Sequence, residues 1–198
     1  MQVAIIKYNA GNIFSVDCAL RRIGVDAVTT DDPRTILAAD KVIFPGVGEA
    51  RAAMEYLQQH GLDELIRSIT KPLLGICIGQ QLLCRHSEEG NVDCLGIFDA
   101  DVVRFKTDDP SFKIPHMGWN DINVVTPTPL LGTDVDNKYV YYVHSYYAPT
   151  SERYTIASTD YIVPFSAALH KDNFYATQFH PEKSGLLGET ILRNFLEL

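Results

Sequence analysis

A cysteine between two glycines is the first feature of the sequence that suggests chemistry. The segment 75–79 reads Gly-Ile-Cys-Ile-Gly, with an apolar run before it and a helix-forming run after it. A strand that turns sharply into a helix strains its middle residue, and flanking side chains would clash, which favours glycine. Such a turn places Cys77 at a helix N-terminus, where free amides favour thiolate over thiol. The pattern therefore predicts a cysteine nucleophile, and its alternative is a small core residue in a tight turn.

A histidine followed by proline and glutamate provides a candidate base. Pro181 fixes φ and ends strand pairing, so His180 is expected at a strand end. The Glu182 carboxylate can turn back to the imidazole, fix its tautomer and stabilise the imidazolium. The alternative is a polar turn before the last helix. The other histidines fall at expected helix ends, at a turn or in aromatic strands, where structural or solvated roles are simplest: His60, His86, His116, His144 and His170.

Taken together, these two segments supply the parts of a Cys–His–Glu triad, Cys77, His180 and Glu182. In an open α/β sheet the carboxyl ends of the strands lie on one edge, where sites form. The amide of Ile78, next to Cys77, would face an oxyanion on the attacked substrate. The residues therefore predict an acyl-transfer hydrolase with a cysteine nucleophile, and they leave its substrate open.

Alternating strands and helices in the first half must position these groups. A buried strand is expected at 2–6, and further strands at 25–30, at 41–48, where the strand runs into a Pro-Gly loop, and at 72–77. Helical spacing is found at 13–24, 49–61, 62–70 and 79–90, and a turn is expected at 9–12. This alternation with short connections predicts parallel strands with helices on both faces.

From about residue 95 the sequence becomes rich in aromatic and β-branched residues, which favour strands. Strands are expected within 95–105, 119–125, 138–149, 154–161 and 166–182. A last helix is expected over 184–198 with Ser184 as its N-cap. The predicted fold class is α/β: a mainly parallel central sheet with flanking helices, plus an antiparallel, strand-rich second half. No linker or repeat divides the chain, so one domain over 1–198 is expected.

Composition and charge narrow the function classes. The chain of 198 residues has a net charge of −8, which argues against broad binding to nucleic acids or anionic membranes. Its four cysteines form no Cys-x-x-Cys pair, which argues against a zinc ribbon and favours reduced thiols in a cytoplasmic protein. The N-terminus does not read as a signal peptide, and no apolar run approaches the roughly 18 residues of a membrane span. Neither a metal nor a cofactor is expected.

The motifs resemble those of a known family. "GICIGQQ" and "QFHPEKS" are similar to the motifs of class I, triad-type glutamine amidotransferases. Further segments resemble the glutaminase subunits of imidazole glycerol phosphate synthase, an enzyme of histidine biosynthesis; in order, they are "YNAGNI", "FPGVGEA", "IPHMGWN", "YVHSYY" and "QFHPEKSG". The resemblance spans the whole chain, although related glutaminases share the cysteine turn and the His-Pro-Glu.

The resemblance implies that glutamine is hydrolysed to glutamate and ammonia. Cys77 would be the nucleophile, His180 the general acid and base, and Glu182 the orienting carboxylate. The oxyanion would rest on the backbone amides of Val47 and Ile78.

Substrate contacts also follow from the resemblance. Gln81 matches the family's contact with the glutamine side chain, although the adjacent Gln80 provides a second candidate amide. The loops with Gly48, Ser145 and Tyr146 match those that hold the substrate's amino-acid end.

A partner is implied as well. Ammonia would pass to a (β/α)₈-barrel cyclase subunit in a heterodimer, which makes imidazole glycerol phosphate and AICAR. Four residues in or beside the family-like loops are interface candidates: Asn12, Met117, Trp119 and Lys183. Trp119 is the only tryptophan, and its alternative is a place in the core.

Three other functions stay open at this point. The first is a triad glutaminase that serves anthranilate, carbamoyl phosphate or purine synthesis. The second is a cysteine peptidase or deglycase-type enzyme of similar architecture. The third is a binding or regulatory subunit without catalysis. Three measurements distinguish these functions. They ask which synthase the chain activates, whether glutamine hydrolysis depends on Cys77, and whether a glutamine analogue alkylates the thiol.

Overall fold

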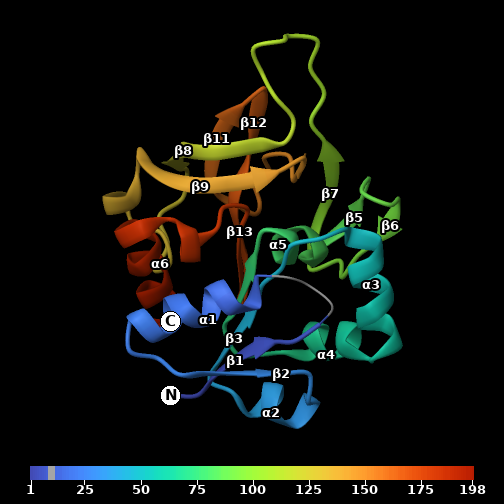
Figure 1. The fold of residues 1–198 in the computed structure, drawn as a ribbon, viewed down its shortest axis with the longest axis vertical. Helices are drawn as coiled ribbons and strands as arrows, with labels where there is room; N and C mark the ends of the chain where they lie inside the picture. Colours follow the sequence, from blue (N-terminus) through green and yellow to red (C-terminus); the bar gives the residue numbers. More distant parts are fainter. Residues whose placement is uncertain (9–11) are drawn as a thin grey trace.

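Short apolar strands, buried along their whole length, form the centre of the molecule (Figure 1). The computed structural model describes residues 1–8 and 12–198, so the turn expected at 9–12 lies largely outside the described residues. The parallel strands run in the order β2–β1–β3–β4–β13. Their bounds are β1 (Val3–Ile6), β2 (Ala27–Thr30), β3 (Lys41–Phe44), β4 (Leu73–Ile76) and β13 (Phe174–Thr177). Burial on both faces explains the mostly apolar sequences of β1, β3, β4 and β13, whereas β2, at the edge of the sheet, is partly exposed.

Antiparallel strands extend this sheet to nine in the order β13–β12–β11–β8–β9. These strands are β8 (His116–Val124), β9 (Lys138–His144), β11 (Thr155–Tyr161) and β12 (Val163–Lys171). A second sheet runs β10–β7–β5–β6, with β5 (Cys84–Ser87), β6 (Val92–Asp93), β7 (Phe98–Arg104) and β10 (Tyr146–Tyr147). Figure 1 shows β8 and β9 lying across the ends of the parallel strands. The second half therefore covers the carboxyl edge of the first.

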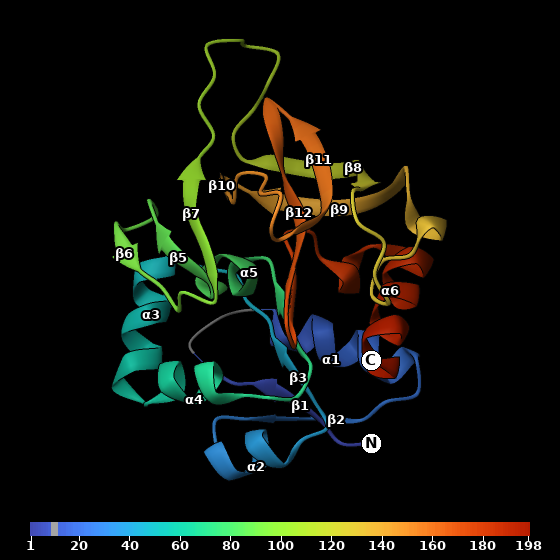
Figure 2. The ribbon, with the colours of Figure 1, turned by 180° about the vertical axis from the view of Figure 1, so that it is seen from behind.

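Helices cover both faces of the parallel strands, on opposite sides in Figure 2. Residues Val3 and Ile5 pack with α1 (Ile13–Arg22) and α6 (Gly185–Glu197), whereas Ala4 and Ile6 pack with the helices of the other face. Those helices are α2 (Pro33–Ala38), α3 (Ala50–Gln59), α4 (Leu62–Ser68) and α5 (Ile78–Leu83). Two 3₁₀ turns complete the elements, η1 (Thr133–Val135) and η2 (Pro181–Lys183). The side chains of β1 thus point alternately into two layers of the apolar core, one on each face of the sheet. The predicted α/β fold class is confirmed.

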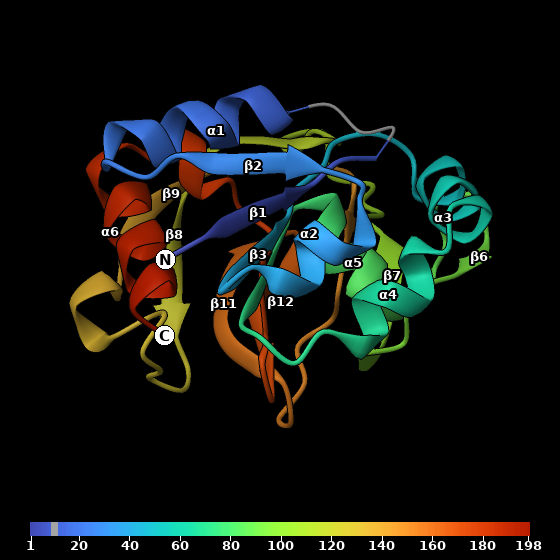
Figure 3. The same cartoon turned by 90° about the horizontal axis from the view of Figure 1, so that it is seen from below.

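Both ends of the chain lie on the same side of the molecule (Figure 3). The Lys41 ammonium, on β3, donates to the carbonyl of Leu198 and so ties the C-terminal end to the sheet. None of the helices in the described ranges has the length and apolar character that crossing a membrane demands.

Two helix expectations were wrong. The helix expected over 79–90 ends at Leu83, because the backbone of Cys84 is extended and the next residues pair with β7 as β5. That pairing overrides the helix propensity of the segment. His86 consequently lies in β5, with Nδ1 2.9 Å from Asp93 Oδ1, and not at a helix end. The helix α2 was not expected, although its Asp32 cap accepts from the Thr35 amide at 2.9 Å and proline begins it.

Ser184 precedes α6 as expected, yet its side chain makes no capping bond to the helix. Its hydroxyl donates to the carbonyl of His180 at 2.6 Å and accepts from the Tyr141 amide at 3.0 Å. Ser184 is therefore the N-cap residue of α6 by position, as expected, but its side chain does not cap the helix. Ser184 instead ties β9 to the turn that holds His180.

Candidate active site

Cys77 occupies a strained turn between β4 and α5, which we call the elbow (residues 75–79). Its φ of 54° and ψ of −106° lie where residues with a side chain rarely fall. A Cβ on Gly79 would overlap the carbonyl oxygen of Phe44, and one on Gly75 would lie 2.7 Å from Leu83 Cδ1. The steric reason predicted for the two glycines is therefore confirmed.

Replacement of Gly79 by alanine should destabilise the protein. The added Cβ meets backbone of β3, which cannot move aside as a flexible side chain can, so we expect a loss of about 3 kcal/mol. Gly132→Ala is the matched control, because Gly132 has an ordinary φ of −79° and its Cβ would meet only the side chain of Asp134. Chemical denaturation of both variants checks this, and equal stability of the two would contradict the packing argument.

His180 and Glu182 lie beside the elbow because β13 and β4 are parallel neighbours. His180 Nδ1 is 2.7 Å from Glu182 Oε1, and both side chains are fully buried. Asn12 Nδ2 donates to the same carboxylate oxygen and lies 3.4 Å from His180 Nδ1. Within the described residues, His180 Nε2 and Glu182 Oε2 have no hydrogen-bond partner. The geometry leaves Nε2 as the ring nitrogen free to exchange protons with Cys77 and a substrate.

The charges of the site favour a protonated His180. Burial acts to lower the pKa of the imidazole, but the Cys77 thiolate and the Glu182 carboxylate outweigh it and raise that pKa above its ordinary value of 6.5. A positive charge beside Cys77 suits a cysteine nucleophile, because the thiolate is the nucleophilic form of the side chain.

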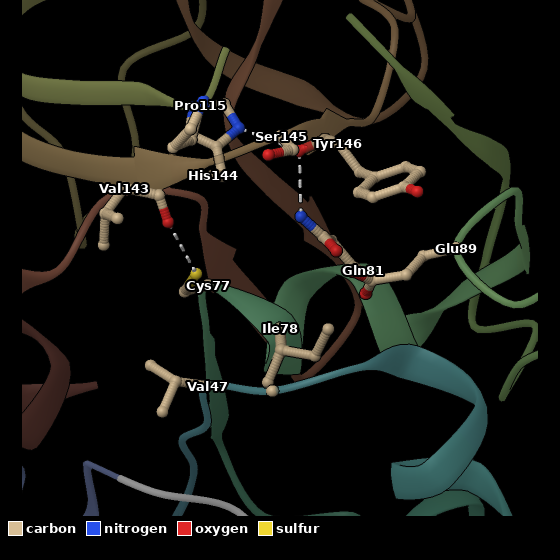
Figure 4. A pocket seen from close by; sticks show the side chains of 11 residues that line it. Val47, Cys77, Ile78, Gln81, Glu89, Pro115, Val143, His144, Ser145 and Tyr146 are labelled. Atoms are coloured by element: carbon tan, nitrogen blue, oxygen red, sulfur yellow. Dashed lines mark hydrogen bonds between the residues drawn. The ribbon is translucent and has the colours of Figure 1, made fainter.

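A cavity of about 280 Å³ opens in front of Cys77 (Figure 4). This volume is at the lower end of small-molecule sites. The six residues that the sequence assigned to substrate and oxyanion all line it: Val47, Gly48, Ile78, Gln81, Ser145 and Tyr146. The remaining lining residues are Cys77, Glu89, Pro115, Val143 and His144. The structure thus brings the expected nucleophile and substrate groups to one cavity, with His180 and Glu182 behind Cys77.

Gln81, and not its neighbour, faces this cavity. Its Nε2 donates to the carbonyl of Tyr146 at 2.9 Å and to Gln178 Oε1 at 3.0 Å. Gln80 Nε2 instead donates to the carbonyl of Ser166 at 3.1 Å, away from the lining residues. The geometry therefore separates the two candidate amides.

A buried histidine pair supports the loop above the cavity. His144 Nδ1 is 2.8 Å from the carbonyl of Tyr146, and its Nε2 is 3.0 Å from His116 Nδ1. Burial lowers the pKa of His144 to about 3 and that of His116 to about 4, so both stay neutral near pH 7. Because a carbonyl only accepts, the His144 proton lies on Nδ1 and His116 donates to His144 Nε2. The structural role expected for these histidines agrees with this chain of bonds.

The Pro-Gly-Val-Gly loop (residues 45–48) forms the opposite wall. Tyr8 Oη donates to the carbonyl of Pro45 at 2.6 Å, and a Cβ on Gly46 would overlap Tyr8 and Ile78. Gly48, by contrast, is exposed and has a φ of +131°, a region that glycine enters without strain. The first half of the loop is therefore fixed against the elbow, and its second half has backbone freedom.

Glu89 is a site residue that sequence reasoning missed. It is the one acidic side chain among the lining residues, and its Oε2 accepts from the Ala50 amide at 3.0 Å. Burial raises the pKa of its carboxyl group. The helix wrongly expected over 79–90 concealed it, because Glu89 lies in the turn between β5 and β6.

The interface candidates divide into two groups. Met117 and Trp119 are 63% and 56% exposed, so a core position for Trp119 is wrong. The ring of Tyr141 lies 6.0 Å from that of Trp119 and 5.9 Å from Lys183 Nζ. We call Met117, Trp119, Tyr141 and Lys183 the β8–β9 patch. Asn12 instead turns inward to Glu182.

Across the described ranges, no group of three or more His, Cys, Asp or Glu side chains is arranged to hold a metal ion. The side chains that face the cavity are instead suited to covalent chemistry at Cys77.

Residues 6–198 match the family described as glutamine amidotransferase class-I. This chain belongs to that family. It is 63% identical over 198 residues to "Imidazole glycerol phosphate synthase subunit HisH" of Bacteroides fragilis, with 100% of both chains covered. The HisH subunit of Escherichia coli K12 is 46% identical over 199 residues, again with 100% of both covered. The family resemblance of the motifs is thereby confirmed.

Solved structures agree on the fold of this amidotransferase. The crystal structure of a putative GMP synthase protein from Thermoplasma acidophilum has a TM-score of 0.75 and 22% identity, covering 100% of this chain and 93% of its own. At that identity the likeness supports the architecture alone.

Proposed function

We propose that this chain is the glutaminase subunit of an imidazole glycerol phosphate synthase, hydrolysing glutamine and passing the ammonia to a cyclase subunit. The observation that carries the proposal is Cys77 at the elbow beside the His180–Glu182 pair, in a chain 63% identical over its full length to a HisH subunit. The full-length relatives named HisH favour this assignment over the glutaminases of other pathways.

The reaction begins with attack of the Cys77 thiolate on the side-chain amide carbon of glutamine. The oxyanion is stabilised by the backbone amides of Ile78 and Val47, and each such donor contributes about 2.7–4 kcal/mol in other enzymes. His180 protonates the departing nitrogen, because an amide anion does not leave. Water activated by His180 then hydrolyses the thioester and glutamate departs.

The hydrogen bonds of Gln81 indicate how the substrate amide is held. Both N–H groups of its Nε2 are used by Tyr146 and Gln178, which leaves Oε1 to accept from the substrate. A glutamine side chain offers an NH₂ donor there, whereas glutamate at neutral pH offers none. The Glu89 carboxylate is suited to the α-ammonium group, and the loops of Gly48, Ser145 and Tyr146 hold the amino-acid end.

The partner is proposed to dock on the β8–β9 patch. Exposed apolar and aromatic side chains beside the catalytic edge suit an interface, and the Lys183 ammonium can pair with an acidic partner residue. Docking there would seal the cavity from water and direct ammonia inward. Docking would also fix the orientation of the Val47 backbone amide, which the adjacent Gly48 leaves free to turn.

Basal glutaminase activity should therefore be low and should rise when a ligand-bound cyclase is added. Lys183→Ala should weaken complex formation or this activation by about tenfold, the equivalent of about 1.4 kcal/mol, without unfolding the protein. Lys71→Ala is the matched control, because Lys71 is exposed at the opposite end of β4. Coupled glutamate assays with and without cyclase measure the effect. Full activity of the isolated chain, unchanged by the cyclase, would defeat the proposal.

A further inference from the structure

A buried glutamine contacts the sulfur of Cys77 from behind the cavity. Gln178 follows β13 and has no exposed surface. Its backbone N–H donates to the carbonyl of Ala167 at 2.8 Å. Its side-chain Nε2 lies 3.7 Å from Cys77 Sγ. The distance fits an N–H···S hydrogen bond. The backbone bond to Ala167 fixes the position of the Gln178 main chain, from which the side chain reaches the sulfur.

Neighbouring bonds determine which end of this amide faces the sulfur. The carbonyl of Tyr146 is an acceptor only, so the atom of Gln81 that it contacts must be the nitrogen. That same nitrogen contacts Gln178, which must therefore present its oxygen to Gln81. The Gln178 NH₂ group is left pointing at Sγ. A donor and not an acceptor thus faces the sulfur, although nitrogen and oxygen have nearly the same shape.

Two contacts of the sulfur compete. The carbonyl of Val143 lies 3.9 Å from Sγ and can accept a hydrogen bond only from a thiol (Figure 4). Gln178 Nε2 donates, and such a bond is stronger to a thiolate than to a thiol. The titratable neighbours that act on Cys77 are His180 and Tyr8. Gln178 is thus a neutral group that favours the charged sulfur without itself titrating.

We propose that Gln178 is a positioning residue for this reaction: its amide, oriented by Tyr146 through Gln81, donates to the Cys77 sulfur and stabilises the thiolate. The inference rests on the nucleophilic role proposed for Cys77. It assigns to Gln81 a second task, since the residue that accepts from the substrate amide also sets the donor for the nucleophile. Substrate binding and nucleophile activation therefore share one hydrogen-bonded chain.

The test is the pH dependence of Cys77 alkylation by iodoacetamide, measured peptide by peptide by mass spectrometry on the full chain without substrate. Gln178→Met keeps the length of the side chain and removes the donor. Its alkylation midpoint should rise by about one pH unit, as expected for the loss of one charge-assisted hydrogen bond. In the complex with cyclase, kcat should fall about tenfold while KM stays nearly unchanged.

Gln80→Met is the matched control, because Gln80, on α5, is an equally buried glutamine whose side-chain amide contacts Ser166 and not the sulfur. Its alkylation midpoint should equal that of the wild type. Burial raises the pKa of the Cys84 and Cys94 thiols, so both resist alkylation in the folded chain and report unfolding in each sample. Equal shifts in Gln80→Met and Gln178→Met would overturn the inference.

If Gln178→Met exposes those two thiols, Gln178→Asn takes its place. Asparagine keeps the amide but is one methylene shorter, so it cannot reach both Gln81 and the sulfur, and the same upward shift is expected. A wild-type midpoint in the folded variant overturns the inference and leaves the glutaminase function standing. Absence of glutamine hydrolysis by the wild-type chain with cyclase would instead remove the function itself, and retained hydrolysis after Cys77→Ala would remove Cys77 from the mechanism.

Discussion

Replacement of Cys77 by alanine should lower glutamine hydrolysis by about 10⁴-fold or more, since removal of the nucleophile leaves only binding and the oxyanion amides. Cys77→Ser should be nearly as inactive. A hydroxyl ionises at far higher pH than a thiol, so serine at this position is a much weaker nucleophile. Glutamate release in the presence of cyclase measures both variants.

The fold should survive this change. Cys77 is small, and its strained backbone is imposed by β4 and α5 on either side. Cys18→Ala is the control, because Cys18 lies on α1 away from the cavity and should keep wild-type turnover with a small stability cost. Wild-type-like turnover in Cys77→Ala or Cys77→Ser would remove Cys77 from the mechanism.

The elbow around Cys77 and the contact between His180 and Glu182 were predictable because local sequence determines both. The elbow needs glycine at 75 and 79 for steric reasons within the turn and against β3, and Glu182 reaches His180 across two residues. Periodicity then placed the parallel strands, whose carboxyl ends bring the two segments together. Local pattern and simple topology were sufficient for this part of the site.

Other features depend on contacts between distant segments. Cys84 to Ser87 form a strand only because β7 lies beside them, so helix propensity gave the wrong element and concealed Glu89. Ser145 and Tyr146 were placed by family resemblance, since no periodicity predicts that β9 crosses the ends of β4 and β13. The sulfur contact of Gln178 is of the same kind, spanning 101 residues of sequence.

Glu182→Gln should lower turnover much less than His180→Ala. In the proposed mechanism the histidine moves protons in both halves of the reaction, whereas the carboxylate orients its ring. We expect His180→Ala to lose about 10⁶-fold in kcat, the loss found when the histidine of another triad is removed. Steady-state assays of both variants with cyclase make the comparison, and a glutamine variant as inactive as His180→Ala would give Glu182 a different role.

The pH profile supplies a second readout with a definite sign. Burial lowers the pKa of His180, and the charges of Cys77 and Glu182 raise it above the ordinary value. Glutamine at 182 is neutral, so the pKa of His180 should fall and its imidazolium should be lost at lower pH. The alkaline limb of kcat/KM should therefore move toward acid in Glu182→Gln. An unchanged limb would show that Glu182 does not act on the charge of His180.

Asn12 explains why the glutamine variant should remain active. Its Nδ2 donates to the carboxylate oxygen that His180 contacts, so that position must hold an acceptor. In Glu182→Gln, the Asn12 donor therefore holds the new side-chain amide with its oxygen toward His180. The amide nitrogen then takes the place of Oε2, which has no partner among the described residues.

Asn12→Ala in the Glu182→Gln background should then cost more than in the wild type, because the freed amide can turn its nitrogen toward His180 and disturb the tautomer. A carboxylate has no such wrong orientation, since both of its oxygens accept. The double-mutant cycle measures this difference directly. Coupling of about 1 kcal/mol or more is expected, within the range for residues of one hydrogen-bonded network. Additive effects of the two substitutions would place Asn12 outside the orientation of the triad and return it to the partner interface.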